Sequence, residues 1–298
     1  MSDLAAPEAT TIERVGVVGA GLMGSGIAEV CARAGLEVVI REVDSSAISA
    51  AEKRIERSLE RGVASGKMTD VARLHALERI RISTSLDDLS ACQMVIEAVV
   101  EDEHAKLEVF AALDDIVGDP RAVLASNTSS IPIMTLAMAT GRPERVVGIH
   151  FFNPVPVLKL VELVTSLVTS EQTAHTARTF VTEHLGKKVI ASQDRAGFVV
   201  NALLIPYILS AVRMFESGFA TAEDIDTGMV EGCAHPMGPL ALADLIGLDT
   251  TRAVAESMYE EFKEPLYAPP PLLARMVDAG LLGRKTGRGF YPYGTRAS

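Results

Sequence analysis

The 298-residue sequence predicts an α/β fold in which a doubly wound parallel sheet, carrying an inserted helical hairpin, is followed by an all-α C-terminal domain. Three observations predict it. Short apolar strands alternate with helical patterns through the first part of the chain, which is typical of a parallel sheet. A helical stretch too long for one crossover interrupts that alternation after the second strand. From Arg195 onwards the pattern is helical alone, so we predict domains at residues 12–192 and 193–298.

The composition is that of a globular protein able to bury a large core, with 48% apolar and 22% charged residues. A formal net charge of −11 disfavours unspecific binding to nucleic acid or an anionic membrane. No apolar run reaches the ~18 residues of a membrane span, and the acidic residues 1–8 lack the order of a signal or transit peptide. The three cysteines form no metal-ligand spacing and suit a reducing compartment. We therefore expect a cytoplasmic protein without a metal site.

The first strand, Arg14–Val18, runs directly into Gly19-Ala20-Gly21-Leu22-Met23-Gly24, and a helical pattern follows. A G-x-G-x-x-G motif alone is weak, but here it has the strand before it and the helix after it that a dinucleotide-binding turn requires. Gly19 permits the tight turn, Gly21 lets backbone approach a pyrophosphate, and Gly24 allows close helix–strand packing. The helix N-terminus supplies free N–H groups for the phosphates. The sequence thus predicts a Rossmann-type domain.

An acidic residue follows the second strand, Glu37–Ile40, as this fingerprint expects. Glu42 is placed to accept hydrogen bonds from the adenosine ribose hydroxyls. Its charge would repel a 2′-phosphate, which favours NAD over NADP. Arg41 leaves NADP as the alternative, since its guanidinium could reach such a phosphate.

Polar groups follow three later strands of the predicted sheet. Glu101 and Lys106 come after Met94–Ala98, residues 126–130 after Ala122–Ala125, and His150 directly after Val146–Ile149. One such cluster could be a helix cap, and Ser130 could cap a helix beginning after Pro132. Because carboxyl ends of parallel strands share one edge, three clusters together predict a site there. Two more strands are predicted, at Arg79–Ile82 and Lys187–Ile190.

The stretch from His150 to Glu162 contains an imidazole and a carboxylate with Pro154 and Pro156 between them. Prolines fix the backbone and favour a turn, which would fold Glu162 back towards His150. A carboxylate bonded to one ring nitrogen sets the tautomer, and the other nitrogen can then take a proton from a substrate. A lone histidine is more often a satisfied core residue, but the surrounding polar groups favour a general base.

The insertion spans residues 46–78, and its pattern is broken between Gly62 and Thr69. Two antiparallel helices fit this length better than one. Alternating basic and acidic residues on the first arm favour a solvated, salt-bridged face. The alternative is that basic or hydroxyl side chains meet a phosphorylated substrate, the candidates being Arg54, Ser58, Arg61 and Lys67.

The second domain is predicted to contain four helices. The first runs from Asn201 to Phe215, and Pro206 within it predicts a kink or a late start. The others are predicted at Ala222–Cys233, Leu240–Phe262 and Leu272–Ala279.

From about Arg14 to Tyr293 the chain resembles the L-3-hydroxyacyl-CoA dehydrogenase family, particularly its short bacterial 3-hydroxybutyryl-CoA dehydrogenases. The resemblance implies a Rossmann-type NAD-binding domain and an all-helical domain for substrate and homodimer contacts. The motifs that carry it are Gly19–Gly24, Ala125-Ser-Asn-Thr-Ser-Ser130, His150-Phe-Phe-Asn-Pro-Val-Pro156, Gly197-Phe-Val-Val-Asn201, His235-Pro-Met-Gly-Pro239 and Lys285-Thr-Gly-Arg-Gly-Phe-Tyr291.

The resemblance also implies residue roles. His150 matches the catalytic base and Glu162 its orienting carboxylate, while Ser129 and Asn201 match residues that hold the substrate and its reacting oxygen. Glu42 matches the ribose-binding acid, although the family more often has Asp there. Further cofactor contacts are implied at Glu101, Lys106, Ser129, Asn153 and Lys285. Ser58 matches a coenzyme A contact; a family lysine is replaced near Ser65, with Lys67 close by.

The implied activity is reversible oxidation of an L-3-hydroxyacyl-CoA, of short chain, to the 3-oxoacyl-CoA in fatty acid metabolism. Two alternatives stay open: a dehydrogenase of a free hydroxy acid such as L-gulonate, and a non-catalytic, crystallin-like NAD-binding protein. From the length of 298 residues we expect no fused hydratase domain.

Overall fold

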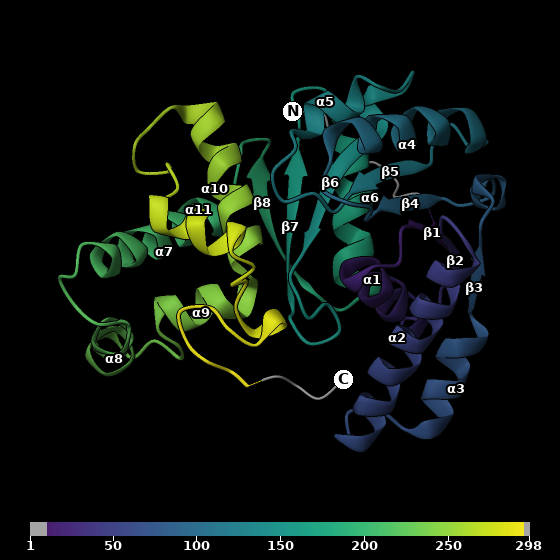
Figure 1. Ribbon diagram of the computed structural model, residues 1–298. Helices are drawn as coiled ribbons and strands as arrows, with labels where there is room; N and C mark the ends of the chain where they lie inside the picture. The colour runs from purple at the N-terminus through teal and green to yellow at the C-terminus, as the bar shows by residue number, and fades with distance from the viewer. Residues whose placement is uncertain (1–10, 295–298) are drawn as a thin grey trace, which may run out of the picture. The chain divides into compact units, whose positions relative to one another are not determined.

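The computed structural model describes residues 11–294 of the chain. These residues form two compact units, of which the first ends at Arg195 and the second begins at Ala196 (Figure 1).

The first unit is built on one eight-stranded sheet with the order β3-β2-β1-β4-β5-β6-β7-β8. The strands predicted from their apolar runs are confirmed, with ends that differ by a few residues. Their bounds are β1 (Arg14–Val18), β2 (Glu37–Arg41), β3 (Ile80–Ser83), β4 (Met94–Glu97), β5 (Val123–Ser126), β6 (Val146–Phe151), β7 (Leu160–Thr165) and β8 (Lys188–Gln193). The strand order reverses between β1 and β4, and ligands of such sheets gather beyond the strand ends at that point.

Helices lie on both faces of this sheet (Figure 1). Alternate strand residues, such as Val15 and Val17, pack with α1, α2 and α6 in one large apolar core. On the other face Ile133 of α5 contacts Gly148 of β6, where a larger residue would not fit. The bounds are α1 (Leu22–Arg33), α2 (Ser45–Ala64), α3 (Asp70–Glu78), α4 (Glu103–Ile116), α5 (Ile133–Ala137) and α6 (Glu171–Thr179).

β7 is a strand that the sequence did not reveal, and it runs antiparallel to β6. The other neighbouring strands in this sheet are parallel, β7 and β8 included. A short turn containing Pro154 and Pro156 connects β6 to β7, so no crossover helix is needed. The polar Glu162 interrupts the apolar run of β7, so the sequence pattern did not predict a strand there.

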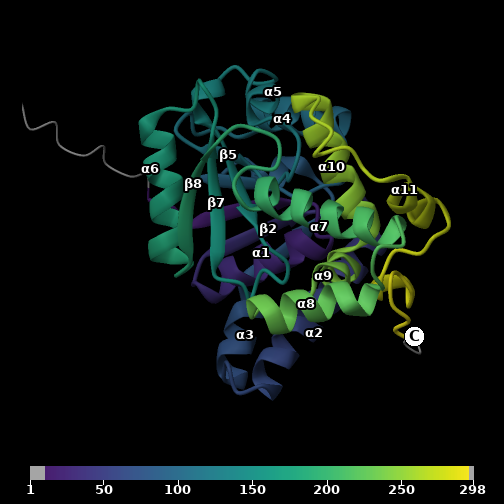
Figure 2. The ribbon, with the colours of Figure 1, turned by 90° about the vertical axis from the view of Figure 1, so that its left-hand side faces the viewer.

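The insertion is a helical hairpin, as predicted. α2 and α3 lie side by side (Figures 1 and 2). Each arm begins with a side-chain cap: Asp44 accepts from the Ala47 N–H, and Thr69 accepts from the Ala72 N–H. The Thr69 cap explains why the helical pattern restarts after the break.

α5 begins after Pro132, but the suggestion that Ser130 caps it is wrong. The Asp194 carboxylate beyond β8 accepts hydrogen bonds from the N–H groups of Ile133 and Met134, at 2.8 and 2.7 Å. A carboxylate complements the positive helix end better than a hydroxyl. The Ser130 hydroxyl instead donates to Glu101.

The second unit is helical and has its own apolar core. One correction applies: the predicted helix Leu240–Phe262 is two helices, because Gly247 between them has a φ of +106° that side chains rarely adopt. Pro206 lies inside the first helix. The bounds are α7 (Val200–Glu216), α8 (Ala222–Cys233), α9 (Pro239–Ile246), α10 (Leu248–Phe262) and α11 (Pro271–Asp278).

Asp244 of α9 holds the last described segment of this unit. Its carboxylate accepts hydrogen bonds from the N–H groups of Phe290 and Tyr291 and from the Tyr293 hydroxyl, each at 3.0 Å. Burial, reinforced by the hydrogen bond to Asp244, raises the pKa of Tyr293 to about 12. Arg284 lies over the Tyr293 ring, 5.2 Å from its centroid.

Candidate active site

The glycine turn between β1 and α1 has the form that a bound dinucleotide requires. Gly19 has a φ of +86°, and a Cβ on Gly24 would collide with the Gly19 carbonyl oxygen. A Cβ on Gly21 would meet nothing within 4 Å, so space is open beside the turn at that residue. Leu22 and Met23 begin α1, whose free N–H groups face the turn. The three predicted glycine roles fit this geometry.

Glu42, just beyond β2, lies against the glycine turn. Its Oε1 accepts a hydrogen bond from the Ala20 N–H at 2.5 Å, and its Oε2 accepts from the Val43 N–H at 3.1 Å. The sequence placed this carboxylate near the ribose of a dinucleotide. The contact with Ala20 brings it to the turn where the adenosine end of such a ligand lies in this fold.

Arg54 of α2 is also bonded to the glycine turn. Its Nη1 donates to the Ala20 carbonyl oxygen at 2.6 Å, and the Ser25 hydroxyl donates to the same oxygen at 2.6 Å. Arg54 is thus used within the protein. Ser58, one helical turn later, is half-buried, and Lys67 is exposed in the loop after α2. The coenzyme A contacts implied for Ser58 and Lys67 stay predictions.

His150 and Glu162 face each other across β6 and β7. The antiparallel register pairs these two residues directly, and the His150 Nδ1 lies 2.7 Å from the Glu162 Oε2. Both side chains are buried, with 6% of His150 and none of Glu162 exposed. The predicted approach of the carboxylate to the imidazole is therefore confirmed. The strand pairing produces it, and the prolines lie in the turn between the strands.

The second ring nitrogen of His150 faces a serine hydroxyl. Ser129 follows β5, and its Oγ lies 2.9 Å from the His150 Nε2. Because a carboxylate can only accept, Glu162 holds the imidazole proton on Nδ1 and leaves Nε2 as an acceptor. A hydroxyl group of a substrate near Nε2 and Ser129 could therefore give its proton to His150.

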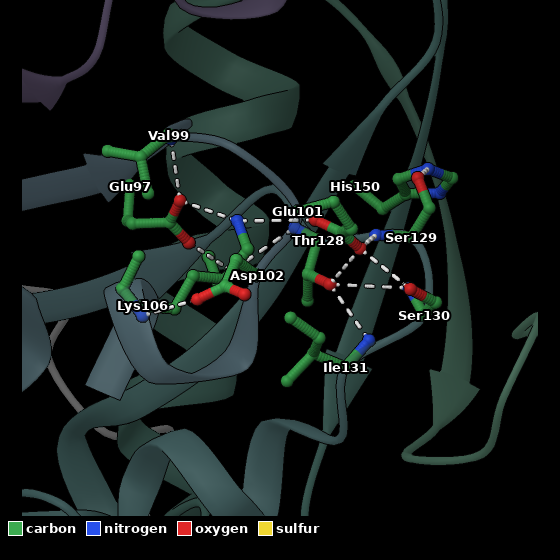
Figure 3. A network of polar contacts seen from close by, with 12 residues as sticks. Glu97, Val99, Glu101, Asp102, Lys106, Thr128, Ser129, Ser130, Ile131 and His150 are labelled. Carbon is green, nitrogen blue, oxygen red and sulfur yellow. Dashed lines mark hydrogen bonds and ion pairs between the residues drawn. The ribbon is translucent and has the colours of Figure 1, made fainter. Parts of the chain in front are cut away.

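Glu101 fixes the segment that carries Ser129 (Figure 3). Its Oε1 accepts from the N–H groups of Ser129 and Ser130, at 2.9 and 3.1 Å, and from the hydroxyls of Thr128 and Ser130. Burial acts to raise the pKa of Glu101, but Lys106 and the donated hydrogen bonds outweigh it and hold the pKa below its usual range. Glu101 is thus an anion that organises the loop, as the predicted convergence of strand ends requires.

Behind Glu101 lies a residue that the sequence reasoning missed. Glu97, the last residue of β4, is fully buried, and its Oε1 accepts from the Lys106 Nζ at 2.6 Å. Its Oε2 accepts from the Ser126 hydroxyl at 2.6 Å. The signal that could have found it is a carboxylate that continues the apolar run of Met94–Ile96, because buried charges in strands need partners.

Asn127 belongs to the predicted polar cluster 126–130, but the sequence assigned it no role of its own. Its Oδ1 accepts from the Phe151 N–H at 2.9 Å and so bonds the end of β5 to β6 directly after His150. The tripeptide Ser126-Asn127-Thr128 thus supplies three polar side chains, each used inside the protein.

Asn201 and Lys285 lie in the second unit, and Asn153 in the exposed turn after β6. Asn201 is half-buried near the start of α7. The Lys285 ammonium donates to the Asp249 carboxylate, with Oδ1 at 2.6 Å. The roles implied for these three residues stay predictions.

Within residues 11–294, no three His, Cys, Asp or Glu side chains are grouped as a metal ion would need. Across the same residues, no helix is both long and apolar enough to cross a membrane.

Each of the two units matches the model of a known protein domain. Residues 14–195 match the model of the 3-hydroxyacyl-CoA dehydrogenase NAD binding domain, and residues 197–293 match that of the 3-hydroxyacyl-CoA dehydrogenase C-terminal domain. The 3-hydroxybutyryl-CoA dehydrogenase of Mycobacterium tuberculosis (strain ATCC 25618 / H37Rv) is 62% identical over 282 residues, covering 95% of this chain and 99% of that protein.

Two crystal structures are similar over the same length. M. tuberculosis FadB2 has a TM-score of 0.95 and 61% sequence identity, covering 96% of this chain and 100% of that one. The (S)-3-hydroxybutyryl-CoA dehydrogenase PaaH1 of Ralstonia eutropha has a TM-score of 0.90 and 47% identity, again covering 96% and 100%. With its glycine turn, its strand-end polar groups and both domain matches, the chain belongs to the 3-hydroxyacyl-CoA dehydrogenase family.

Proposed function

We propose that this protein reversibly oxidises L-3-hydroxyacyl-CoA to 3-oxoacyl-CoA with NAD, in fatty acid metabolism, and that 3-hydroxybutyryl-CoA is its preferred substrate. The observation that carries the proposal is the line Glu162–His150–Ser129, in which each contact is 2.9 Å or shorter. It combines an oriented base with a hydroxyl group at the carboxyl ends of the strands. The relatives named 3-hydroxybutyryl-CoA dehydrogenase support the short acyl chain.

In this reaction His150 removes the proton of the C3 hydroxyl through Nε2, while the C3 hydride leaves the substrate. Bound NAD supplies the acceptor of that hydride. Glu162 stabilises the imidazolium that His150 becomes, because the carboxylate already faces Nδ1. Ser129 orients the reacting oxygen, and Asn201 of the second unit is proposed to hold the same oxygen. In reduction His150 returns the proton.

The glycine turn and Glu42 are the groups proposed to hold the adenosine and pyrophosphate of NAD. The open space at Gly21 and the carboxylate beside Ala20 fit such a ligand. Glu101, Asn153 and Lys285 are proposed to contact its nicotinamide half. Ser58 and Lys67 of the hairpin are proposed to contact coenzyme A.

The deciding experiment is a steady-state series of 3-oxoacyl-CoA substrates from C4 to C16, each assayed with NADH and with NADPH. We expect the highest kcat/KM with acetoacetyl-CoA and NADH. Turnover of free hydroxy acids such as L-gulonate with NAD, without turnover of any acyl-CoA, would overturn the substrate assignment. NADH binding without turnover of any of these substrates would identify a non-catalytic protein.

We also propose a homodimer formed through the helical unit. Large apolar side chains are exposed there, among them Leu203 of α7 and Phe219 at 75% and 79%. Exposed apolar groups of this size favour association. Light scattering at micromolar concentration is expected to give twice the 31.7 kDa mass of the chain, and a monomer mass would contradict the proposal.

We further propose that the protein resides in the cytoplasm. Cys31 and Cys92 are free and buried, and Cys233 is free and exposed. Free thiols persist in a reducing compartment. Fractionation of the source cells would test this placement.

A further inference from the structure

The polar groups behind Ser129 form a buried ion pair whose role the reaction scheme does not explain. Glu97 is fully buried in the sheet, and Lys106 of α4 has 1% of its side chain exposed. Removing two charges from water is costly, and such a pair is often no more stable than apolar residues of the same volume. A contribution to geometry therefore accounts for the pair better than a contribution to stability.

Lys106 is placed to act through another residue. Its side chain is almost fully buried, so its ammonium acts on the carboxylates around it. Its Nζ donates to the Glu97 Oε1 at 2.6 Å and lies 3.3 Å from the Glu101 Oε2. The ammonium is thus a bridge between two carboxylates, of which Glu101 has 37% of its side chain exposed.

The pair controls both ends of the segment that carries Ser129. At its start, the Glu97 Oε2 accepts from the Ser126 hydroxyl. At its end, Glu101, held by Lys106, accepts from the Ser129 and Ser130 N–H groups. The buried Glu97 carboxylate therefore fixes the segment at two points: directly at Ser126, and through Lys106 and Glu101 at Ser129.

We propose that Glu97 and Lys106 are positioning residues, which act through Ser126 and Glu101 to hold the Ser129 hydroxyl against His150. The kinetic consequence rests on the proposed dehydrogenase function. A displacement of ~1 Å at a reacting group can lower the rate about 100-fold. Loss of the pair should thus lower kcat.

The test compares Glu97→Gln, Lys106→Met and the double variant with the wild-type protein. Lys106→Met leaves the buried Glu97 without its ion-pair partner and can prevent folding, whereas the double variant removes both charges together. The matched control is Asp114→Asn with Arg142→Gln. That ion pair, 2.6 Å apart, lies at the other end of the same helix. Thermal melting confirms that each variant is folded.

Expected results concern turnover. In the double variant, kcat for acetoacetyl-CoA at saturating NADH should fall ~10–100-fold. The control pair should change kcat less than about twofold. A kcat of the double variant within about twofold of the wild-type value would overturn the proposal.

A second measurement separates positioning from a general structural role. Ser129→Ala should lower kcat strongly in the wild-type protein but by less than about twofold in the double variant, because Ser129 has already lost its position there. Equal effects of Ser129→Ala in both backgrounds would show that the ion pair does not act on Ser129.

Hydrogen exchange tests the positioning role without depending on the proposed function. The amide protons of residues 126–130 should exchange faster in the double variant, whatever substrate the enzyme takes. If the wild-type protein fails to reduce any acyl-CoA, the function fails, and the exchange result still decides the positioning role. Unchanged protection of this segment would overturn the positioning role even in an active enzyme.

Discussion

The Ser129 Oγ lies 2.9 Å from the His150 Nε2, although Ser129 follows β5 and His150 lies near the end of β6. Neighbouring β5 and β6 are parallel, so their carboxyl ends meet at one edge. The contact leaves the imidazole nitrogen that does not face Glu162 beside a hydroxyl group, which is where a substrate alcohol is proposed to bind.

Replacing the base should abolish most turnover. His150→Ala is expected to lower kcat by ~10²–10⁴, since it removes the group proposed to take the proton. The NADH dissociation constant should be unchanged within experimental error. Stopped-flow or steady-state absorbance of NADH measures the first quantity, and fluorescence titration the second. Near-normal turnover would remove His150 from the mechanism.

Replacing the orienting carboxylate should affect the same step. Glu162→Gln preserves the volume of a fully buried side chain but removes the charge that stabilises an imidazolium. We expect kcat to fall ~10²-fold or more, with KM less affected. An unchanged kcat would show that strand pairing alone orients His150.

Glu42 should determine both cofactor affinity and the choice between NADH and NADPH. Glu42→Ala removes the acceptor of the Ala20 N–H and should weaken NADH binding about tenfold, a change of ~1.4 kcal/mol. Discrimination against NADPH should fall, because the repelling charge is gone. The exposed Glu37 of the same strand offers the matched control Glu37→Ala, which should alter neither value. Unaltered discrimination in Glu42→Ala would contradict the assignment.

Asp194 should contribute to stability as the cap of α5. Asp194→Ala leaves the Ile133 and Met134 N–H groups without their carboxylate and should cost about 1 kcal/mol of unfolding free energy. Asp194→Asn keeps an acceptor and should recover part of that loss. Urea unfolding of the three proteins measures the series. Equal losses in both variants would rule out capping as the cause.

Tyr293 gives a pH dependence whose sign follows from its raised pKa. A folded-state pKa of about 12, above the ordinary tyrosine pKa of 10.0, favours the protonated folded state. This stabilisation is complete below pH 10 and is lost as the pH rises towards 12. Tyr293→Phe should be less stable by ~1 kcal/mol at neutral pH through loss of the Asp244 hydrogen bond.

The stability difference between wild type and Tyr293→Phe should therefore shrink in alkaline solution. Thermal melting from pH 8 to 11.5 measures it. Tyr259→Phe, at an exposed tyrosine of α10, is the control and should show no such trend. A difference that widens with pH would contradict the raised pKa.

The parts of the fold that depend on local chemistry could be predicted from the sequence. Gly19 and Gly24 predicted the nucleotide turn because each is required by local sterics. Gly19 adopts a positive φ, and a Cβ on Gly24 would collide with the Gly19 carbonyl oxygen. Glu101, Ser129 and His150 were expected to converge because each follows a strand, and parallel strands end at one edge. The hairpin followed from a break in helical periodicity.

Features that depend on distant partners could not be predicted. The role of Glu97 depends on its contacts with Lys106 and with Ser126, which is 29 residues away. The cap of α5 comes from Asp194, 61 residues beyond Ile133, whereas Ser130 lies close by in sequence. Gly247 splits a helix only through its φ, which composition does not reveal.

The antiparallel pairing of β6 with β7 decides which changes of chain length the active site can accept. Side chains alternate across a strand, so a one-residue deletion inside β7 before Glu162 would turn that carboxylate to the opposite face. Residues added at the exposed positions 157–158 of the turn would leave the pairing intact. The number of residues between base and carboxylate is thus less restricted than the position of Glu162 within its strand.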